Sequence, residues 1–430
     1  MKNLFQEELA IFRQILLSIG LGILVGLPCG ASSWLFLVCL EWATEMQATH
    51  SWLLYLLPFA GILIPLVYLQ FEPSIEAGNN LILEEIHQPS ANVPWRMAPL
   101  VATATVFSHL FGASTGREGT AVQMGGSLAD WLARHIGMNE QNRRTMLVCG
   151  VSGGFGAVFG TPLAGMVFGM EVLSIGRMRY STLLPCFISS VVGDQFCQFL
   201  GATHHDYRLA LTFNLTFTTY LNILLLGILA GLTSLLFIEM THFVSNQSKK
   251  RLGNSIFRPF LGGIMIIILT FVCGSKDYLG LSLPLIEQSF TSNPISSIAF
   301  LWKLIFTATS LGMGFKGGEV TPLFCMGAAL GHAFAITNGM PVELFAAIGF
   351  VAVFAGAANT PLSCIIMGIE LFGSNIAVPI AFGCILAYLA SGHRSIYHSQ
   401  RIDTAKNHEL SFVVDMSIKD LNKHNKKPEK

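Results

Sequence analysis

Charged side chains are scarce in this sequence. Only 12% of its 430 residues are charged and 52% are hydrophobic, whereas about 25% of the residues of soluble domains are charged. This scarcity excludes an ordinary water-soluble globular protein. The formal net charge of zero at pH 7 does not indicate a nucleic-acid partner, so none is expected.

Motifs for catalysis and metal binding are missing as well. The nine cysteines form no C-x-x-C pair, and because most lie inside apolar runs they are expected to behave as small hydrophobes. The sequence contains neither the G-x-x-x-x-G-K-[ST] segment of an ATPase nor the H-E-x-x-H segment of a metalloprotease. His204, His205 and Asp206 adjoin one another but have no further ligand at a suitable spacing. We therefore expect no metal, no cofactor and no enzyme activity.

Long apolar stretches occupy most of the chain. They lie at 11–40, 52–69, 97–111, 145–173, 181–202, 209–240, 257–273, 297–313, 322–336, 343–372 and 375–391. A membrane span needs about 20 apolar residues, and shorter runs are typical of tilted or re-entrant half-helices. The predicted fold class is an all-α polytopic membrane protein, because transmembrane barrels show short alternating segments instead. Basic residues at 143–144, 177–179 and 249–251 mark cytoplasmic loops.

The chain contains an internal duplication. The segment GNNLILEE at 78–85 matches GLSLPLIE at 280–287, and TPLAGMVFGME at 161–171 matches TPLSCIIMGIE at 360–370. We place the first repeat at 1–205 and the second at 206–392. Residues 393–430 then form a C-terminal segment that ends in a short polar cytoplasmic tail. Such repeats are common in membrane transporters, where they are often inverted and the ion site lies where broken helices meet.

Both repeats carry a glycine-rich break before a helical pattern. The breaks are GREGT at 116–120 and GGEVTP at 317–322. A helix that begins inside the membrane presents free N–H groups and the positive end of its dipole, which together form an anion site. The hydroxyl groups of Thr120 and Thr321 can add donors. Two such helix ends that converge would hold one small anion without a full positive charge.

Glu118 has a specific role in this arrangement. A carboxylate at a positive helix end mimics the anion and occupies its site, and protonation removes the attraction so that an anion can enter. One carboxylate then couples anion movement to proton movement, and intramembrane ionisable groups are functional by default. The alternative is a structural ion pair between Arg117 and Glu118. We disfavour it because adjacent side chains on turn backbone usually point apart.

These motifs resemble the CLC superfamily of anion channels and proton-coupled antiporters. The resemblance rests on GREG before a helix, on the second Gly-Gly break with its proline, and on the repeated x-P-L blocks. It covers about 10–400 and implies a CLC-type fold of two inverted repeats, with broken re-entrant helices around an anion pathway in each subunit of a homodimer. It also implies that Glu118 is the gate and that Tyr397 faces the anion.

Several departures from the chloride-handling members resemble the fluoride/proton antiporter branch. GNNLI at 78–82 stands where those members carry Gly-Ser-Gly-Ile-Pro, and GREGT stands for G-R-E-G-P. Val172 falls where many exchangers carry an inner proton-relay glutamate. The branch exports fluoride across the bacterial inner membrane and confers fluoride resistance. Asn79 falls at its altered anion-site residue, and an Asn amide offers two N–H donors where Ser offers one O–H.

Together the helix ends and the resemblance define an expected site. The anion-binding residues are Asn79, Gly116, Gly119, Thr120, Val320, Thr321 and Tyr397, with Glu118 as the gating and proton-coupling acid. Glu319 is the candidate second proton-coupling acid, or alternatively a helix-start charge, and Lys316 is placed to pair with it. Glu171 and Glu370 occupy equivalent repeat positions and are interpreted as structural. Glu84 and Glu85 are interpreted as helix-surface charges.

The predicted function is proton-coupled fluoride export, a secondary active antiport of fluoride against protons by a multi-pass protein. Two alternatives stay open. One is a chloride- or nitrate-type exchanger, which the Asn79 and Thr120 departures disfavour. The other is a passive anion channel that keeps Glu118 as its gate. A membrane enzyme or sensor is disfavoured because catalytic motifs and soluble modules are missing.

Overall fold

The computed structural model describes residues 2–71, 73–89, 92–204, 207–209, 213 and 215–424. These residues are predominantly helical, as predicted. The first series of helices is α1 (Lys2–Thr49), α2 (Leu57–Phe71), α3 (Asn79–His87), α4 (Met97–Leu110), α5 (Glu118–His135), α6 (Glu140–Phe159), α7 (Pro162–Glu171) and α8 (Leu183–Phe199). The second is α9 (Phe217–Leu252), α10 (Phe257–Cys273), α11 (Leu283–Ser289), α12 (Ala299–Met313), α13 (Val320–Asn338), α14 (Val342–Ala358), α15 (Pro361–Phe372) and α16 (Ala377–Ala390), and α17 (Ile418–His424) follows.

Shorter elements connect these helices. The 3-10 helices are η1 (Ser51–Leu56), η2 (Pro73–Ala77), η3 (Tyr180–Thr182), η4 (Ser374–Ile376) and η5 (His408–Val413). Two short strands, β1 (Ser174–Ile175) and β2 (Arg401–Ile402), pair in parallel and connect the C-terminal segment to the stretch between α7 and α8.

Four helical segments in the described part of the chain are long and apolar enough to cross a membrane, namely Gln6–Thr49, Ser51–Phe71, Phe217–Leu252 and Val320–Asn338. Other apolar helices, such as α4, α10 and α15, are shorter. Large apolar side chains such as Phe199 and Phe217 remain exposed on the outside of the molecule. A chain with spans, half-helices and an apolar exterior is a multi-pass membrane protein.

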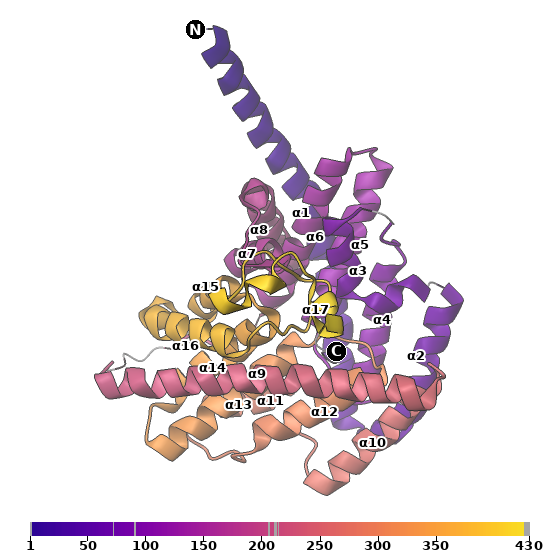
Figure 1. Cartoon of the computed structure of the whole chain (residues 1–430). Helices are drawn as coiled ribbons and strands as arrows, with labels where there is room; N and C mark the ends of the chain where they lie inside the picture. Colours follow the sequence, from indigo (N-terminus) through magenta and orange to yellow (C-terminus); the bar gives the residue numbers. More distant parts are fainter. Residues whose placement is uncertain are drawn as a thin grey trace.

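The two helical series pack in matching ways. Helix α5 packs on α6 as α13 packs on α14, and α1 packs on α8 as α9 packs on α16, while α7 meets α15 between the two series. Figure 1 shows the first series in indigo to magenta and the second in pink to orange, with α9 running across the molecule. The proposed repeat boundary at 205/206 lies in a stretch with residues outside the described part, so its position stays a prediction.

Reciprocal contacts relate α7 and α15. The carboxylate of Glu171, at the end of α7, accepts the backbone N–H groups of Leu362 and Ser363 at 3.0 and 2.8 Å. The carboxylate of Glu370, in α15, accepts those of Leu163 and Ala164 at 2.9 and 2.8 Å. The first N–H groups of a helix have no partner within the helix, and α7 and α15 each begin with a proline, which suits a first turn. Each acid therefore accepts hydrogen bonds from the free N–H groups at the start of the other helix. This exchange is the contact expected of a two-fold relation, and it supports the structural interpretation of both acids.

An ionic cluster joins α3, α5 and α6. Asp130, with no exposed surface, accepts hydrogen bonds from Arg143 at 2.6 Å, Arg134 at 3.0 Å and the Val93 N–H at 3.0 Å. Arg143 also bonds Glu85 at 2.7 Å. The interpretation of Glu85 as a helix-surface charge was therefore wrong, since its side chain is only 3% exposed and lies in this cluster. The cluster holds α3, which begins with Asn79, against α5.

The C-terminal segment returns to the interior after α16. The Gln400 side chain donates to the carbonyl groups of Val172 and Ala358, both at 3.0 Å. The Ser399 N–H donates to Asn80 in α3 at 3.0 Å. These bonds hold Tyr397, which is 4% exposed, inside the protein near the start of α3.

Candidate functional site

The two glycine breaks lie side by side. The Gly116 N–H donates to the Gly318 carbonyl at 2.6 Å, and the Gly318 N–H donates to the Gly116 carbonyl at 2.8 Å, which forms an isolated antiparallel bridge. A Cβ atom on Gly116 would lie 2.8 Å from Pro322 Cδ, closer than side chains approach. Glycine is thus required for this contact. It brings the first residues of α5 and α13 together, as expected of two converging helix ends.

The Glu118 carboxylate lies at the N-terminus of α13. Its Oε2 atom accepts the backbone N–H of Thr321 at 3.0 Å and that of Arg117 at 3.1 Å. Its Oε1 atom accepts the hydroxyl group of Thr321. The side chain has no exposed surface. A negative group thus fills a position where a helix end and a hydroxyl group would otherwise be available to an anion.

Arg117 lies closer to this carboxylate than we expected. Its Nε atom is 3.4 Å from Glu118 Oε1, and its side chain is 17% exposed. The expectation that the two adjacent side chains point apart was wrong. The turn places the Arg117 N–H and its guanidinium group on the same carboxylate, so the ion pair and the helix-end position coexist rather than exclude each other.

A cavity of about 220 Å³ lies beside the start of α5, and Asn79, Glu319 and Tyr397 line it. A Cβ atom on Gly119 would lie 3.1 Å from Asn79 Nδ2 and 3.7 Å from Glu319 Oε2. Both side chains therefore reach the first turn of α5. Asn79 Oδ1 is buried and has no hydrogen-bond partner within the described residues. Three of the predicted site residues thus line one cavity.

Glu118 is not among the residues that line this cavity. Its carboxylate is bound at the start of α13, whereas Glu319, the residue that precedes α13, reaches the cavity beside α5. Each acid therefore lies at the start of the helix from the other series: Glu118 at the start of α13, and Glu319 beside the start of α5.

Other predicted residues lie differently. The Thr120 hydroxyl is 2.7 Å from that of Thr105 in α4, and Thr105 in turn donates to the Val101 carbonyl at 2.7 Å. Thr120 therefore donates its hydroxyl hydrogen to Thr105, so in this structure that hydrogen is not available to an anion. Val320 is an apolar first residue of α13 that is 1% exposed, so only its backbone can serve an anion. The Lys316 Nζ atom lies 4.7 Å from the ring centre of Tyr68, instead of forming the expected pair with Glu319.

Gln123, His242 and His398 also line the cavity, and none of them was predicted from the sequence. Gln123 lies one turn after Gly119 on α5 and is 8% exposed, and a Cβ atom on Gly78 would lie 3.5 Å from its Nε2 atom. His242 on α9 and His398 line the cavity with their rings stacked at 4.3 Å. Gln123 could have been found as a polar residue one helical turn beyond the break. His242 lies far along the chain from the motifs, and no sequence signal connects it to them.

The described residues contain no group of three or more His, Cys, Asp or Glu side chains that could hold a metal ion. His204 lies 3.5 Å from Asp194. His205 and Asp206, which completed the candidate cluster, lie outside the described residues.

The sequence is similar to those of known anion channels and transporters. The model of the voltage gated chloride channel family matches residues 60–392. A chloride/fluoride channel protein of Pseudomonas syringae pv. tomato is 48% identical over 408 residues, which are 94% of this chain and 90% of the relative. An H(+)/Cl(-) exchange transporter ClcA of Vibrio parahaemolyticus is 26% identical over 338 residues, which are 74% of this chain and 72% of the relative.

Solved structures agree with the family match. A CLC-type fluoride/proton antiporter has a TM-score of 0.86 and 32% sequence identity, over 91% of this chain and 98% of that protein. A slow cyanobacterial Cl-/H+ antiporter has a TM-score of 0.73 over 88% of this chain and 94% of that protein, and at 19% identity this likeness shows the fold alone. The predicted CLC-type fold and the resemblance to the CLC superfamily are confirmed.

Proposed function

The chain belongs to the voltage-gated chloride channel family, and we propose that it exports fluoride across the cell membrane in exchange for protons, which gives the cell fluoride resistance. The observation that carries this proposal is the Glu118 carboxylate at the N-terminus of α13. The likeness to a chloride/fluoride channel protein and to a fluoride/proton antiporter supports fluoride as the anion.

In this mechanism Glu118 competes with fluoride for the same helix end. While it is ionised, its carboxylate accepts the Thr321 N–H and hydroxyl groups and the pathway is closed. A proton removes the charge that the helix end attracts, so the neutral side chain can leave. The Thr321 donors and Arg117 stay behind and present a positive site to an incoming fluoride. The pathway therefore opens to the anion only when a proton has been taken up.

The cavity beside α5 would receive fluoride on the other side of the bridge. The Asn79 amide supplies N–H donors there, and Tyr397 lies in the same wall. An ionised Glu319 would repel a fluoride ion at this place, since like charges in a buried space destabilise each other strongly. Protonation of Glu319 would accompany fluoride entry, and this makes it the second proton-coupling acid in our proposal.

The remaining proposals concern the whole protein. We place it in the bacterial inner (plasma) membrane as a secondary active transporter, in line with the Pseudomonas relative. It would work as a homodimer with one anion pathway in each subunit. The repeats would span 1–205 and 206–392, and 393–430 would close the inner end of the pathway with Tyr397 before the polar tail.

One experiment tests this function against chloride or nitrate exchange. Purified protein is reconstituted into liposomes loaded with fluoride or with chloride, and anion efflux and internal pH are recorded together. We expect fluoride efflux with proton uptake and much slower chloride efflux. Equal rates for chloride would favour the chloride-type exchanger, and efflux without proton movement would favour a passive channel.

A further inference from the structure

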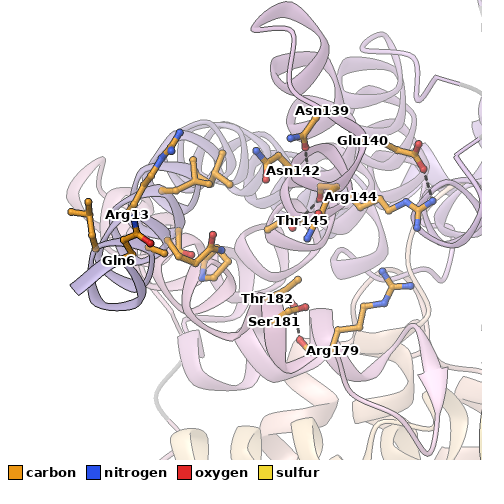
Figure 2. A pocket seen from close by; sticks show the side chains of 18 residues that line it. Gln6, Arg13, Asn139, Glu140, Asn142, Arg144, Thr145, Arg179, Ser181 and Thr182 are labelled. Carbon is orange, nitrogen blue, oxygen red and sulfur yellow. Dashed lines mark hydrogen bonds and ion pairs between the residues drawn. The ribbon is translucent and has the colours of Figure 1, made fainter. Parts of the chain in front are cut away.

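A second and larger cavity lies away from the site. It is bounded by α1, by the start of α6, and by η3 with the start of α8. Its volume is about 1070 Å³. All three of Arg13 of α1, Arg144 of α6 and Arg179 before η3 line it, and Figure 2 shows Arg13 on one side with Arg144 and Arg179 on the opposite side. We call it the arginine cavity after these three residues. Glu140 is the acid in its lining.

The lining of this cavity contains more basic than acidic side chains. Glu140 pairs with Arg144 at 2.5 Å, yet the Arg144 Nε atom is buried and has no partner among the described residues. No ion pair joins Arg179 to an acid within the described part of the chain. Burial, and then the like charges of Arg144 and Arg177, lower the pKa of the Arg179 guanidinium group. The half-buried Arg179 and the unpaired donor of Arg144 indicate that an anionic group outside this chain completes the cavity.

The surroundings place that anionic group at a membrane surface. The cavity adjoins the start of α6, which carries Arg143 and Arg144, and the loop at 177–179. The basic residues of these two segments assign this end of the molecule to the cytoplasmic side, although 143–144 lies in a helix and not in the loop that the sequence predicted. The N-terminal part of α1 extends away from the other helices beside it (Figure 1). There α1 exposes Ile11, Phe12 and Leu16 by 54%, 58% and 54%, next to the polar face that carries Arg13. The polar cavity thus adjoins an apolar surface. A phospholipid needs both, one for its headgroup and the other for its acyl chains.

We propose that the arginine cavity binds the phosphate headgroup of an anionic phospholipid from the cytoplasmic leaflet, whose acyl chains lie along the exposed apolar face of α1. Arginine forms two parallel hydrogen bonds with a phosphate group and is well suited to this role. Basic pockets between helices on the cytoplasmic side are a known means of binding anionic headgroups. Bound in this way, the lipid links α1 to α6 and α8, and it stabilises α1 where no other helix supports it.

Native mass spectrometry of the purified protein tests the proposal without any transport assay, so its failure is separate from failure of the proposed function. The protein is incubated with equal amounts of phosphatidylglycerol and phosphatidylcholine, and the bound lipids are counted. We expect wild type to retain several-fold more phosphatidylglycerol. Arg179→Gln and Arg13→Gln should both lose this preference, and Arg179→Lys should keep part of it because the charge remains.

Matched controls decide between sources of the anionic group. Lys250→Gln removes an exposed basic residue outside the cavity and should leave the preference intact. Added inorganic phosphate should not displace the lipid, and complete displacement would overturn the proposal in favour of a free phosphate. Equal retention of both lipids by wild type would overturn it too. An unchanged lipid preference in Arg179→Gln, together with a smaller fraction of dimer in the mass spectrum, would also overturn it. That result would assign the cavity to contact with a second copy of this chain.

Discussion

The Glu118 carboxylate accepts the backbone N–H of Thr321 at 3.0 Å, although the two residues lie 203 positions apart in the chain. This bond joins the break before α5 to the first turn of α13. Glu171 and Glu370 make the same type of contact in a reciprocal pair. The Glu118 contact has no such counterpart, because the residue at the same place in the second helical series is the apolar Val320. The Glu118 side chain can therefore leave the start of α13 without breaking a reciprocal contact in the other half of the molecule. This freedom is what a gate requires.

Asn79→Ser is expected to weaken the preference for fluoride over chloride. The Asn79 amide reaches the first turn of α5, and serine would supply one donor in place of two. The measurement is the ratio of fluoride to chloride efflux rates from liposomes, which we expect to fall by roughly tenfold, equivalent to about 1.4 kcal/mol, the scale of one hydrogen bond.

Thr120→Val serves as the matched control for Asn79→Ser. Its hydroxyl group bonds to Thr105 rather than facing the cavity, so the fluoride/chloride ratio should stay near that of wild type. A large change in Thr120→Val with no change in Asn79→Ser would mean that the helix end, and not the cavity, sets selectivity.

Glu319→Gln is expected to reduce coupled proton movement or to stall fluoride transport. The amide keeps the shape of the protonated acid but can neither bind nor release a proton. Simultaneous fluoride and proton fluxes from liposomes measure the effect. Glu76→Gln is the control, because Glu76 lines the same cavity but is exposed and pairs with Arg258 at 3.4 Å. Normal exchange in a folded Glu319→Gln protein would reduce Glu319 to a helix-start charge.

Asp130→Asn is expected to destabilise the fold by about 3–5 kcal/mol, because it removes the buried carboxylate charge that pairs with Arg143 at 2.6 Å. Thermal unfolding of the purified protein in detergent measures the loss as a lower Tm. Glu140→Gln provides the comparison, since its pair with Arg144 is partly exposed and should contribute less than about 1 kcal/mol. Equal Tm values for the two variants would refute the structural role of the Asp130 cluster.

The helix-end position of Glu118 could be predicted because charge is rare in this sequence, and a carboxylate in a glycine break before a helix has few roles. Asn79 and Tyr397 came from the family resemblance, which also predicted that they share one pathway. The orientation of Thr120 could not be predicted, because it depends on Thr105 on a different helix. Glu85 was misjudged for the same reason, as its partner Arg143 lies 58 residues away. Side-chain partners across helices are set by packing, which a local pattern does not contain.

The measurement that tests the central claim most directly is fluoride-driven proton uptake in liposomes that contain Glu118→Gln, compared with wild type. Glutamine retains the hydrogen-bonding shape of the protonated side chain but cannot carry a proton, so we predict that proton uptake is abolished while the variant still folds. Wild type should take up protons as fluoride leaves. Undiminished fluoride-driven proton uptake by Glu118→Gln would contradict the account, because the carboxylate at the start of α13 would then take no part in coupling.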